Sequence, residues 1–180
     1  MSLLPIPSSI ETAPAASQMM LQTVQEQLGV VPNLFRLVST SPAALEGYLG
    51  LSGALSKGNL PARTRERIAL AVAEVNQCNY CLSVHSYLAK NMSKLEDAEI
   101  IANRRGYSLD NKADAAVKFA VQVTLQRGHL NEAALKTVKD AGYDDAQIIE
   151  IVLHVALNTW TNYINSVAKT DIDFPLVPAL

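Results

Sequence analysis

Two kinds of segment are missing from this chain of 180 residues. No run approaches the roughly 18 consecutive apolar residues that a membrane-spanning helix needs, and the N-terminus lacks the basic start and apolar core of a signal peptide. The chain also lacks a large excess of charge of either sign, because 15 basic and 17 acidic side chains give a formal net charge of only -2. Such a chain has no broad positive field for phosphate backbones. We therefore expect a cytoplasmic protein that binds neither membranes nor nucleic acid.

Cysteine is scarce as well, and the two cysteines of the chain, Cys78 and Cys81, lie close together. A disulfide across so short a loop restricts the unfolded chain little, so it is a poor structural staple. In a reducing compartment such a pair more often binds a metal ion or takes part in redox chemistry. Hydrophobic residues make up 49% of the chain, which is enough to build the core of one globular domain.

The chain divides into a short arm and a helical remainder. Residues 1–16 contain Pro5, Pro7 and Pro14 among small residues, which predicts an extended N-terminal arm. From Ser17 onward apolar residues recur at helical intervals, and no strand alternation competes with them. We therefore predict a single all-α domain, a multi-helix bundle, over residues 17–180.

Helix punctuation sets the predicted boundaries. Helices are predicted to start at Ser41-Pro42 and at Leu60-Pro61, because proline suits the first position of a helix. Helix ends are predicted at Gly29, Gly58, Gly106 and Gly142. Capping boxes are predicted at Ser93 with Glu96 and at Asp144 with Gln147. The predicted helices lie near residues 17–28, 32–40, 42–57, 61–75, 79–91, 94–105, 111–127, 131–141 and 145–169.

The stretch NQCNYCLSVH places Cys78, Cys81 and His85 on one helical stripe, one turn apart. A free thiol is only a few per cent ionised near neutral pH, so a reactive cysteine needs a base or a helix N-terminus beside it. Three interpretations compete. In the first, the residues are two core cysteines and a hydrogen-bonded histidine. In the second, they are three ligands of a zinc ion, which needs a fourth ligand. In the third, the cysteines are a redox pair in which one thiol attacks an oxidant and the other then forms a disulfide with it.

A longer pattern surrounds this stretch. The run RERIALAVAEVNQCNYCLSVH, residues 65–85, resembles the core of the alkylhydroperoxidase D-like (AhpD-like) branch of the carboxymuconolactone decarboxylase superfamily. Glu66, 12 residues before Cys78, matches the glutamate of that core, and the C-x-x-C pair and the histidine match in spacing. The tail over residues 156–175 also resembles the C-terminal helix of peroxidase-related members. The resemblance implies an all-α bundle of the AhpD-like type.

The resemblance also implies a role for each site residue. Cys81 is the thiol that a hydroperoxide oxidises, Cys78 resolves it into a disulfide, and His85 and Glu66 form a proton relay. It implies a thiol or dihydrolipoyl protein as electron donor, a homo-oligomer such as a dimer, trimer or hexamer, and no bound cofactor or metal. Well-studied members carry a histidine where this chain has Tyr80, and a phenol is a poor base at neutral pH. The relay is therefore expected to depend on Glu66 and His85, with Tyr80 only lining the site.

Two further features are candidates for the site. Glu74 lies on roughly the same helical side as Glu66, so it is either a second carboxylate of the site or the partner of an arginine. The last predicted helix carries a polar stripe of four residues, His154, Asn158, Asn162 and Asn165. Buried amides must be hydrogen-bonded, so the stripe should line a wet cavity, meet a subunit interface or cap other helices. If this helix lies beside the cysteine helix, His154 approaches the thiols.

The sequence thus predicts a thiol-dependent hydroperoxide reductase that uses Cys78 and Cys81. Two alternatives stay open. The first is a cofactor-free lyase or isomerase that uses Glu66 and His85, although the decarboxylase side of the superfamily typically lacks the C-x-x-C pair. The second is a non-enzymatic module in which the dithiol senses oxidants or binds a metal weakly.

Overall fold

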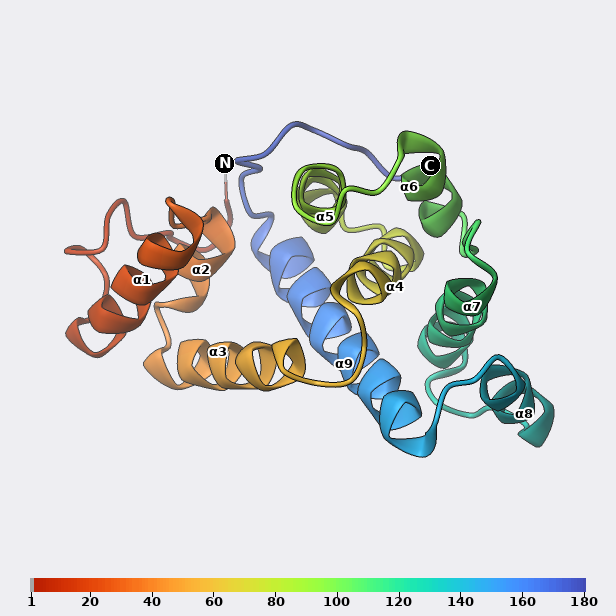
Figure 1. Cartoon of the computed structure of the whole chain (residues 1–180). Coiled ribbons are helices and arrows are strands. Elements are labelled where there is room, and N and C mark those ends of the chain that lie inside the picture. The colour runs from red at the N-terminus through yellow and green to blue at the C-terminus, as the bar shows by residue number, and fades with distance from the viewer. Residues whose placement is uncertain (1) are drawn as a thin grey trace.

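The computed structural model describes residues 2–180, which form nine helices and no strand (Figure 1). This confirms the predicted all-α class. The helices are α1 (Ala15–Leu28), α2 (Asn33–Val38), α3 (Pro42–Ser56), α4 (Ala62–Val75), α5 (Asn79–Asn91), α6 (Asp97–Arg104), α7 (Asn111–Gln126), α8 (Glu132–Asp140) and α9 (Asp145–Ala168). Within the same residues no helix combines the length and the apolar character that crossing a membrane requires.

Helix α4 is the centre of the bundle. It packs against α5, α6, α7 and α9 (Figure 1). Its residues 68–73 are six consecutive apolar residues, and none is more than 3% exposed. A helix that is apolar on all sides is stable only when other helices surround it. The central place of α4 therefore follows from its composition.

Two clusters of buried side chains flank α4. The first joins α4 to α7 and α9 through residues such as Ile68, Phe119 and Ile151. The second includes Leu21, Leu34 and Leu45 of helices α1–α3, together with both cysteines. In Figure 1 helices α1–α3 lie on one side of α9 and the remaining helices on the other. The thiols thus lie in the core that faces the N-terminal helices.

The two predicted capping boxes have different outcomes. The box at the start of α9 is confirmed, since Asp144 Oδ1 accepts from Gln147 N at 2.8 Å and Gln147 Oε1 accepts from Asp144 N at 3.2 Å. The box at Ser93 is wrong, because α6 begins at Asp97. The backbone N–H of Ser93 instead donates to Leu88 O at 3.0 Å and closes the end of α5. Ser93 therefore belongs to the preceding helix end.

The loop between α3 and α4 is held by Glu150 of α9. The carboxylate of Glu150 accepts from the backbone N–H of Asn59 at 2.8 Å and of Leu60 at 3.0 Å. A Cβ atom at Gly58 would lie 2.6 Å from Glu150 Oε2, so a larger residue there would force this carboxylate to move. The contact fixes the start of α4 against α9.

The chain after α9 runs as an extended segment over α5 (Figure 1). The backbone N–H of Val177 donates to Ser83 Oγ, and that of Ala179 donates to Asn79 Oδ1, both at 2.9 Å. The carbonyl of Pro178 accepts from Arg104 Nη2 at 2.6 Å. These bonds hold the C-terminal segment, residues 170–180, against the first half of α5 and the end of α6.

Candidate active site

The break between α4 and α5 places both cysteines at the N-terminus of α5. Gln77 turns the chain with a positive φ of 54°, and Cys78 is the N-cap residue of α5. Cys78 Sγ accepts a hydrogen bond from the backbone N–H of Cys81 at 3.3 Å. Both thiols are free, and their residues are only 2% and 3% exposed. The unpaired N–H groups at a helix N-terminus favour a thiolate at this place.

Glu66 and His85 form an ion pair between α4 and α5. Glu66 Oε2 lies 3.1 Å from His85 Nδ1, and each side chain is 19% exposed. Burial opposes a charged imidazole, but the Glu66 carboxylate and the nearby Cys81 raise the pKa of His85 above its ordinary value. Because Nδ1 faces the carboxylate, Nε2 is the nitrogen that remains for proton exchange in the site.

Two asparagines of α9 reach the same thiol. Asn165 Nδ2 donates to Cys81 Sγ at 3.5 Å and to Thr161 O at 2.9 Å. Asn162 is fully buried, and its Oδ1 accepts from Asn76 Nδ2 at 2.9 Å. Part of the predicted polar stripe therefore belongs to the thiol site. The sequence left a wet cavity, a subunit interface and helix capping open for these residues.

The surroundings make the two thiols unequal. A hydrogen bond from Cys78 is the main reason why the pKa of Cys81 is lowered to about 7; burial opposes the shift, and His85, Asn162 and Asn165 add to it. The same hydrogen bond, together with burial, raises the pKa of Cys78. Cys81 is thus the thiol of the pair that ionises first, while Cys78 keeps its proton.

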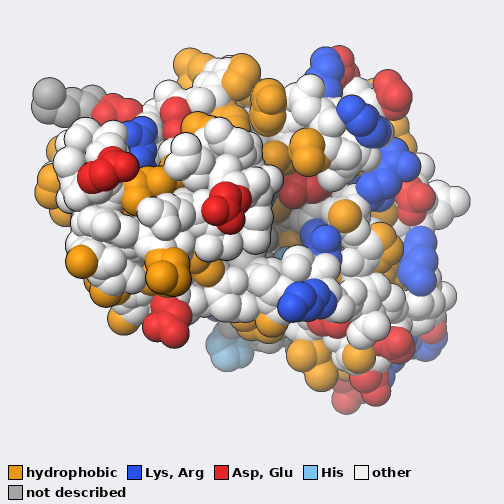
Figure 2. Space-filling view, turned by 60° about the vertical axis from the view of Figure 1, so that its left-hand side comes forward, with side chains coloured by type: hydrophobic (Ala, Val, Ile, Leu, Met, Phe, Trp, Pro, Cys, Tyr) orange, Lys and Arg blue, Asp and Glu red, His pale blue; other side chains and the backbone are white. Residues whose placement is uncertain are grey.

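A pocket of about 330 Å³ lies against this site. Cys81, Glu66 and His85 line it, whereas Cys78 is not among its lining residues in the described chain. Four aromatic side chains form part of its wall, Phe35, Tyr48, Tyr80 and Phe174. The surface is hollowed near the middle of the face that Figure 2 presents. The volume falls in the range of sites for small organic molecules.

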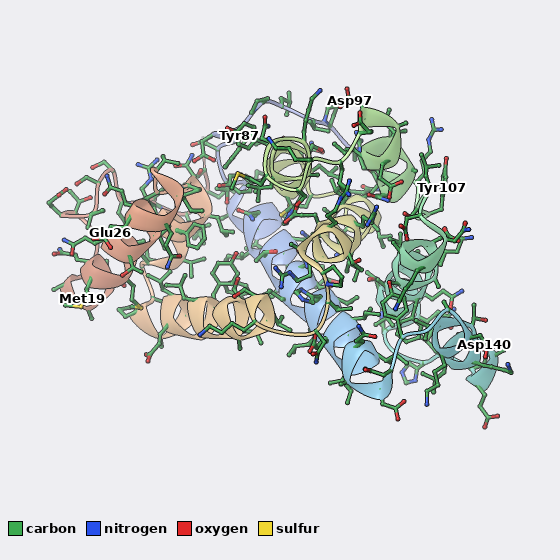
Figure 3. The ribbon with its side chains drawn as sticks, in the orientation of Figure 1. Met19, Glu26, Tyr87, Asp97, Tyr107 and Asp140 are labelled. Atoms are coloured by element: carbon green, nitrogen blue, oxygen red, sulfur yellow. The ribbon has the colours of Figure 1, made fainter. Side chains whose placement is uncertain are left out.

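The C-terminal segment contributes Phe174 to this wall. Its ring centroid lies 6.4 Å from that of Tyr80 and 5.6 Å from that of Tyr87. Tyr87 extends from α5 toward the C-terminal segment in Figure 3. Asp173 Oδ2 accepts from the backbone N–H of Asn33 at 2.7 Å, so the same segment is also tied to α2. The C-terminal segment and α2 therefore complete this side of the pocket.

Two of the three additional candidates lie in the pocket. The hydroxyl of Tyr80 accepts from the backbone N–H of Leu34 at 3.0 Å, which ties α5 to α2. His154 of α9 also lines the pocket that Cys81 lines. Burial, with a smaller contribution from Arg65, lowers the pKa of His154 to about 4. His154 is therefore neutral at physiological pH.

The third candidate, Glu74, lies elsewhere. Its Oε2 accepts from Arg104 Nε at 2.8 Å, and its Oε1 accepts from the backbone N–H of Leu180. This corrects the expectation of a second carboxylate in the site, because an arginine of α6 and the C-terminal segment occupy the Glu74 carboxylate. Among residues 2–180 no group of three or more His, Cys, Asp or Glu side chains is arranged to hold a metal ion.

Part of the sequence and the whole fold are similar to those of known proteins. Residues 42–122 match the model of the Carboxymuconolactone decarboxylase family. The fold matches the crystal structure of an alkylhydroperoxidase AhpD core, an uncharacterized peroxidase-related protein from Ralstonia eutropha JMP134, with a TM-score of 0.86 and 22% identity over 96% of this chain and 92% of that chain. The chain therefore has the fold of the AhpD-like proteins, and its residues 42–122 are similar to the carboxymuconolactone decarboxylase family.

Other proteins are also similar to this chain. A peroxidase-related protein from Silicibacter sp. TM1040 has a TM-score of 0.82 and 23% identity over 94% of this chain and 91% of that one. The debrominase Bmp8 in complex with 2,3,4-tribromopyrrole has a TM-score of 0.80 and 20% identity over 96% and 94%. These likenesses show a shared fold. An uncharacterized protein of Haemophilus influenzae is 48% identical over 46 residues, 25% of this chain, and the match spans only 41% of that relative.

The ion pair predicts a pH effect. Glu66→Gln removes the carboxylate that raises the pKa of His85, so Cys81 loses the neighbouring imidazolium and its pKa should rise. The rate of alkylation by iodoacetamide should have its midpoint at about pH 7 in the natural protein and at higher pH in Glu66→Gln. Glu74→Gln is the matched control, since it removes a carboxylate outside the pocket and should leave the midpoint in place. Equal midpoints for Glu66→Gln and the natural protein would contradict the relay.

Proposed function

We propose that this AhpD-like protein reduces alkyl hydroperoxides through a dithiol–disulfide cycle of Cys78 and Cys81. The observation that carries the proposal is the placement of Cys81 beside a second thiol and in one pocket with the Glu66–His85 pair, and the lowered pKa of Cys81 agrees with it. The pocket beside it has mainly apolar walls, which suit the alkyl group of such a substrate.

In the first step the Cys81 thiolate attacks one peroxide oxygen. The S–O bond forms as the O–O bond breaks, and the sulfur is oxidised by two electrons while the peroxide is reduced. His85 donates its proton to the leaving alkoxide, which departs as an alcohol. The Glu66 carboxylate supports this role because it favours the protonated imidazole before the reaction.

In the second step Cys78 loses its proton and attacks Cys81 Sγ. The S–S bond forms as the S–O bond breaks, and hydroxide leaves with that proton as water. A separate thiol protein or a dihydrolipoyl group then reduces the disulfide by thiol–disulfide exchange and is itself oxidised to a disulfide. No bound cofactor takes part in this cycle.

A second candidate reaction is the reductive removal of halogen from a small aromatic ring. It is favoured by the aromatic wall of the 330 Å³ pocket and by the shared fold with a debrominase bound to 2,3,4-tribromopyrrole. The dithiol would supply two electrons and one proton, the ring carbon would gain hydrogen, and halide would leave as Cys78 and Cys81 form a disulfide.

One experiment separates these functions. One equivalent of an alkyl hydroperoxide should convert the reduced protein to the Cys78–Cys81 disulfide faster than it oxidises a free thiol, and Cys81→Ser should abolish turnover with a thiol donor. Full peroxidase turnover by Cys81→Ser would refute the mechanism. Bromide release from 2,3,4-tribromopyrrole without fast peroxide oxidation would support dehalogenation. Activity on a small lactone acid that survives alkylation of both thiols would support the lyase alternative.

We also propose that the protein is a homo-oligomer. The outer face of α9 carries apolar side chains at helical spacing that remain exposed, among them Ile149, Trp160, Tyr163 and Val167 at 68%, 37%, 59% and 66%. Exposed apolar stripes of this kind mark interaction surfaces. Sedimentation velocity should show a species larger than the monomer, and Tyr163→Lys should shift it toward the monomer. A natural protein that sediments as a monomer at all concentrations would refute this proposal.

A further inference from the structure

We propose that Asn162 and Asn165 form a binding site for the oxygen atom that Cys81 acquires, and that their two amides hold the sulfenic acid until Cys78 attacks it. The inference rests on the proposed hydroperoxide reaction and extends it. It assigns to α9 a part in the reaction itself, whereas the relay and the two thiols come from α4, α5 and the turn between them.

The contact between Asn165 and the reacting sulfur is the first observation. Asn165 Nδ2 lies 3.5 Å from Cys81 Sγ, and Asn165 is 3% exposed. The neighbouring amide of the stripe behaves differently, because Asn158 Nδ2 donates to His154 O at 2.8 Å within its own helix. Intrahelical bonding therefore explains Asn158, but it does not explain why Asn165 also reaches the sulfur.

Unfilled hydrogen-bonding capacity is the second observation. Asn165 Oδ1 is buried without a hydrogen-bond partner among the described residues, and Asn162 Nδ2 is buried there too, with no hydrogen bond of standard geometry although Asn162 helps to lower the pKa of Cys81. Buried polar atoms in proteins are almost always hydrogen-bonded, so each such atom calls for an explanation. One of the two is a donor and the other an acceptor. A sulfenic acid on Cys81 offers the complementary set, an oxygen that accepts and a hydroxyl hydrogen that is donated.

The orientation of the amides is the third observation. Asn76 Nδ2 donates to Asn162 Oδ1 at 2.9 Å, so this oxygen is occupied and the amide of Asn162 presents its nitrogen for another partner. Asn165 Nδ2 is held by Thr161 O at 2.9 Å. These bonds hold each amide in one orientation before any oxygen arrives. Groups that are already oriented lose no free energy to reorganisation during a reaction.

The same site explains how overoxidation is limited. A sulfenate whose oxygen is hydrogen-bonded is a weaker nucleophile toward a second hydroperoxide molecule, and its sulfur stays in place beside Cys78. Without these bonds the intermediate would react further to a sulfinic acid, which no dithiol reduces. Asn162 and Asn165 therefore favour the disulfide over the irreversible product.

The test uses Cys78→Ser, in which the intermediate cannot be resolved and in which serine keeps the N-cap of α5. Asn162→Ala or Asn165→Ala is added to this variant. Asn103→Ala is the matched control, because Asn103 is a fully buried amide of α6 whose hydrogen bonds go to Glu99 and Tyr107. After one equivalent of alkyl hydroperoxide, intact mass and dimedone trapping measure the sulfenic acid over time.

We expect Asn162→Ala and Asn165→Ala each to shorten the lifetime of the Cys81 sulfenic acid by about threefold to tenfold, with faster formation of sulfinic acid. Asn103→Ala should leave both quantities unchanged. Lifetimes with Asn162→Ala and Asn165→Ala equal to that of Cys78→Ser alone would overturn the amide site and leave the peroxidase proposal intact. Failure of Cys78→Ser to gain any oxygen would instead refute the peroxidase proposal, and the amide site with it.

A second measurement needs no asparagine variant, so it does not depend on whether those variants fold. In Cys78→Ser labelled with ¹⁵N, the side-chain amide signals of Asn162 and Asn165 should shift and exchange more slowly with solvent once Cys81 is oxidised. The amide signal of Asn103 should not move. Unchanged signals for Asn162 and Asn165 would overturn the proposal.

Discussion

Cys81 is 3% exposed, and burial by itself favours the neutral thiol. Its pKa is nevertheless lowered to about 7, because polar groups from several elements face the sulfur. Cys78 donates at the N-terminus of α5, His85 contributes charge that Glu66 maintains, and Asn165 donates from α9. Stabilising a buried thiolate is the constraint that the rest of the site serves. It also explains why so many polar side chains lie in an otherwise apolar core.

The short break between α4 and α5 supplies most of the groups that stabilise the Cys81 thiolate. Ending α4 at Val75 creates the N-terminus at which both cysteines lie. The same break carries Asn76, whose amide fixes Asn162 of α9. Because α4 packs against α5, its Glu66 reaches His85. Helix α9 packs against α4 and α5 as well, so its polar side chains lie beside the thiols. The family likeness over residues 42–122 covers this unit, whereas α9 and the C-terminal segment lie beyond it.

The spacing of residues along the chain was enough to predict the features that form within one helix or between helices adjacent in the sequence. The nine helices, the break near Gln77 and the capping box at Asp144 all follow from local rules. Contacts between distant segments could not be predicted in this way. Nothing local to Glu74 shows that Arg104 will occupy it, and the contact of Asn165 with Cys81 depends on how α9 crosses α5. The aromatic wall of the pocket likewise comes from distant segments, because Phe174 lies in the C-terminal segment and Tyr48 in α3.

The difference in pKa between Cys81 and Cys78 is measured most directly by selective labelling of the reduced natural protein. Less than one equivalent of iodoacetamide is added at about pH 6.5, where an ordinary thiol is almost fully protonated, and fragment-ion mapping then locates the label. The account predicts that the label lies on Cys81 and that Cys78 stays unmodified. Label mainly on Cys78, or shared equally between the two, would contradict it.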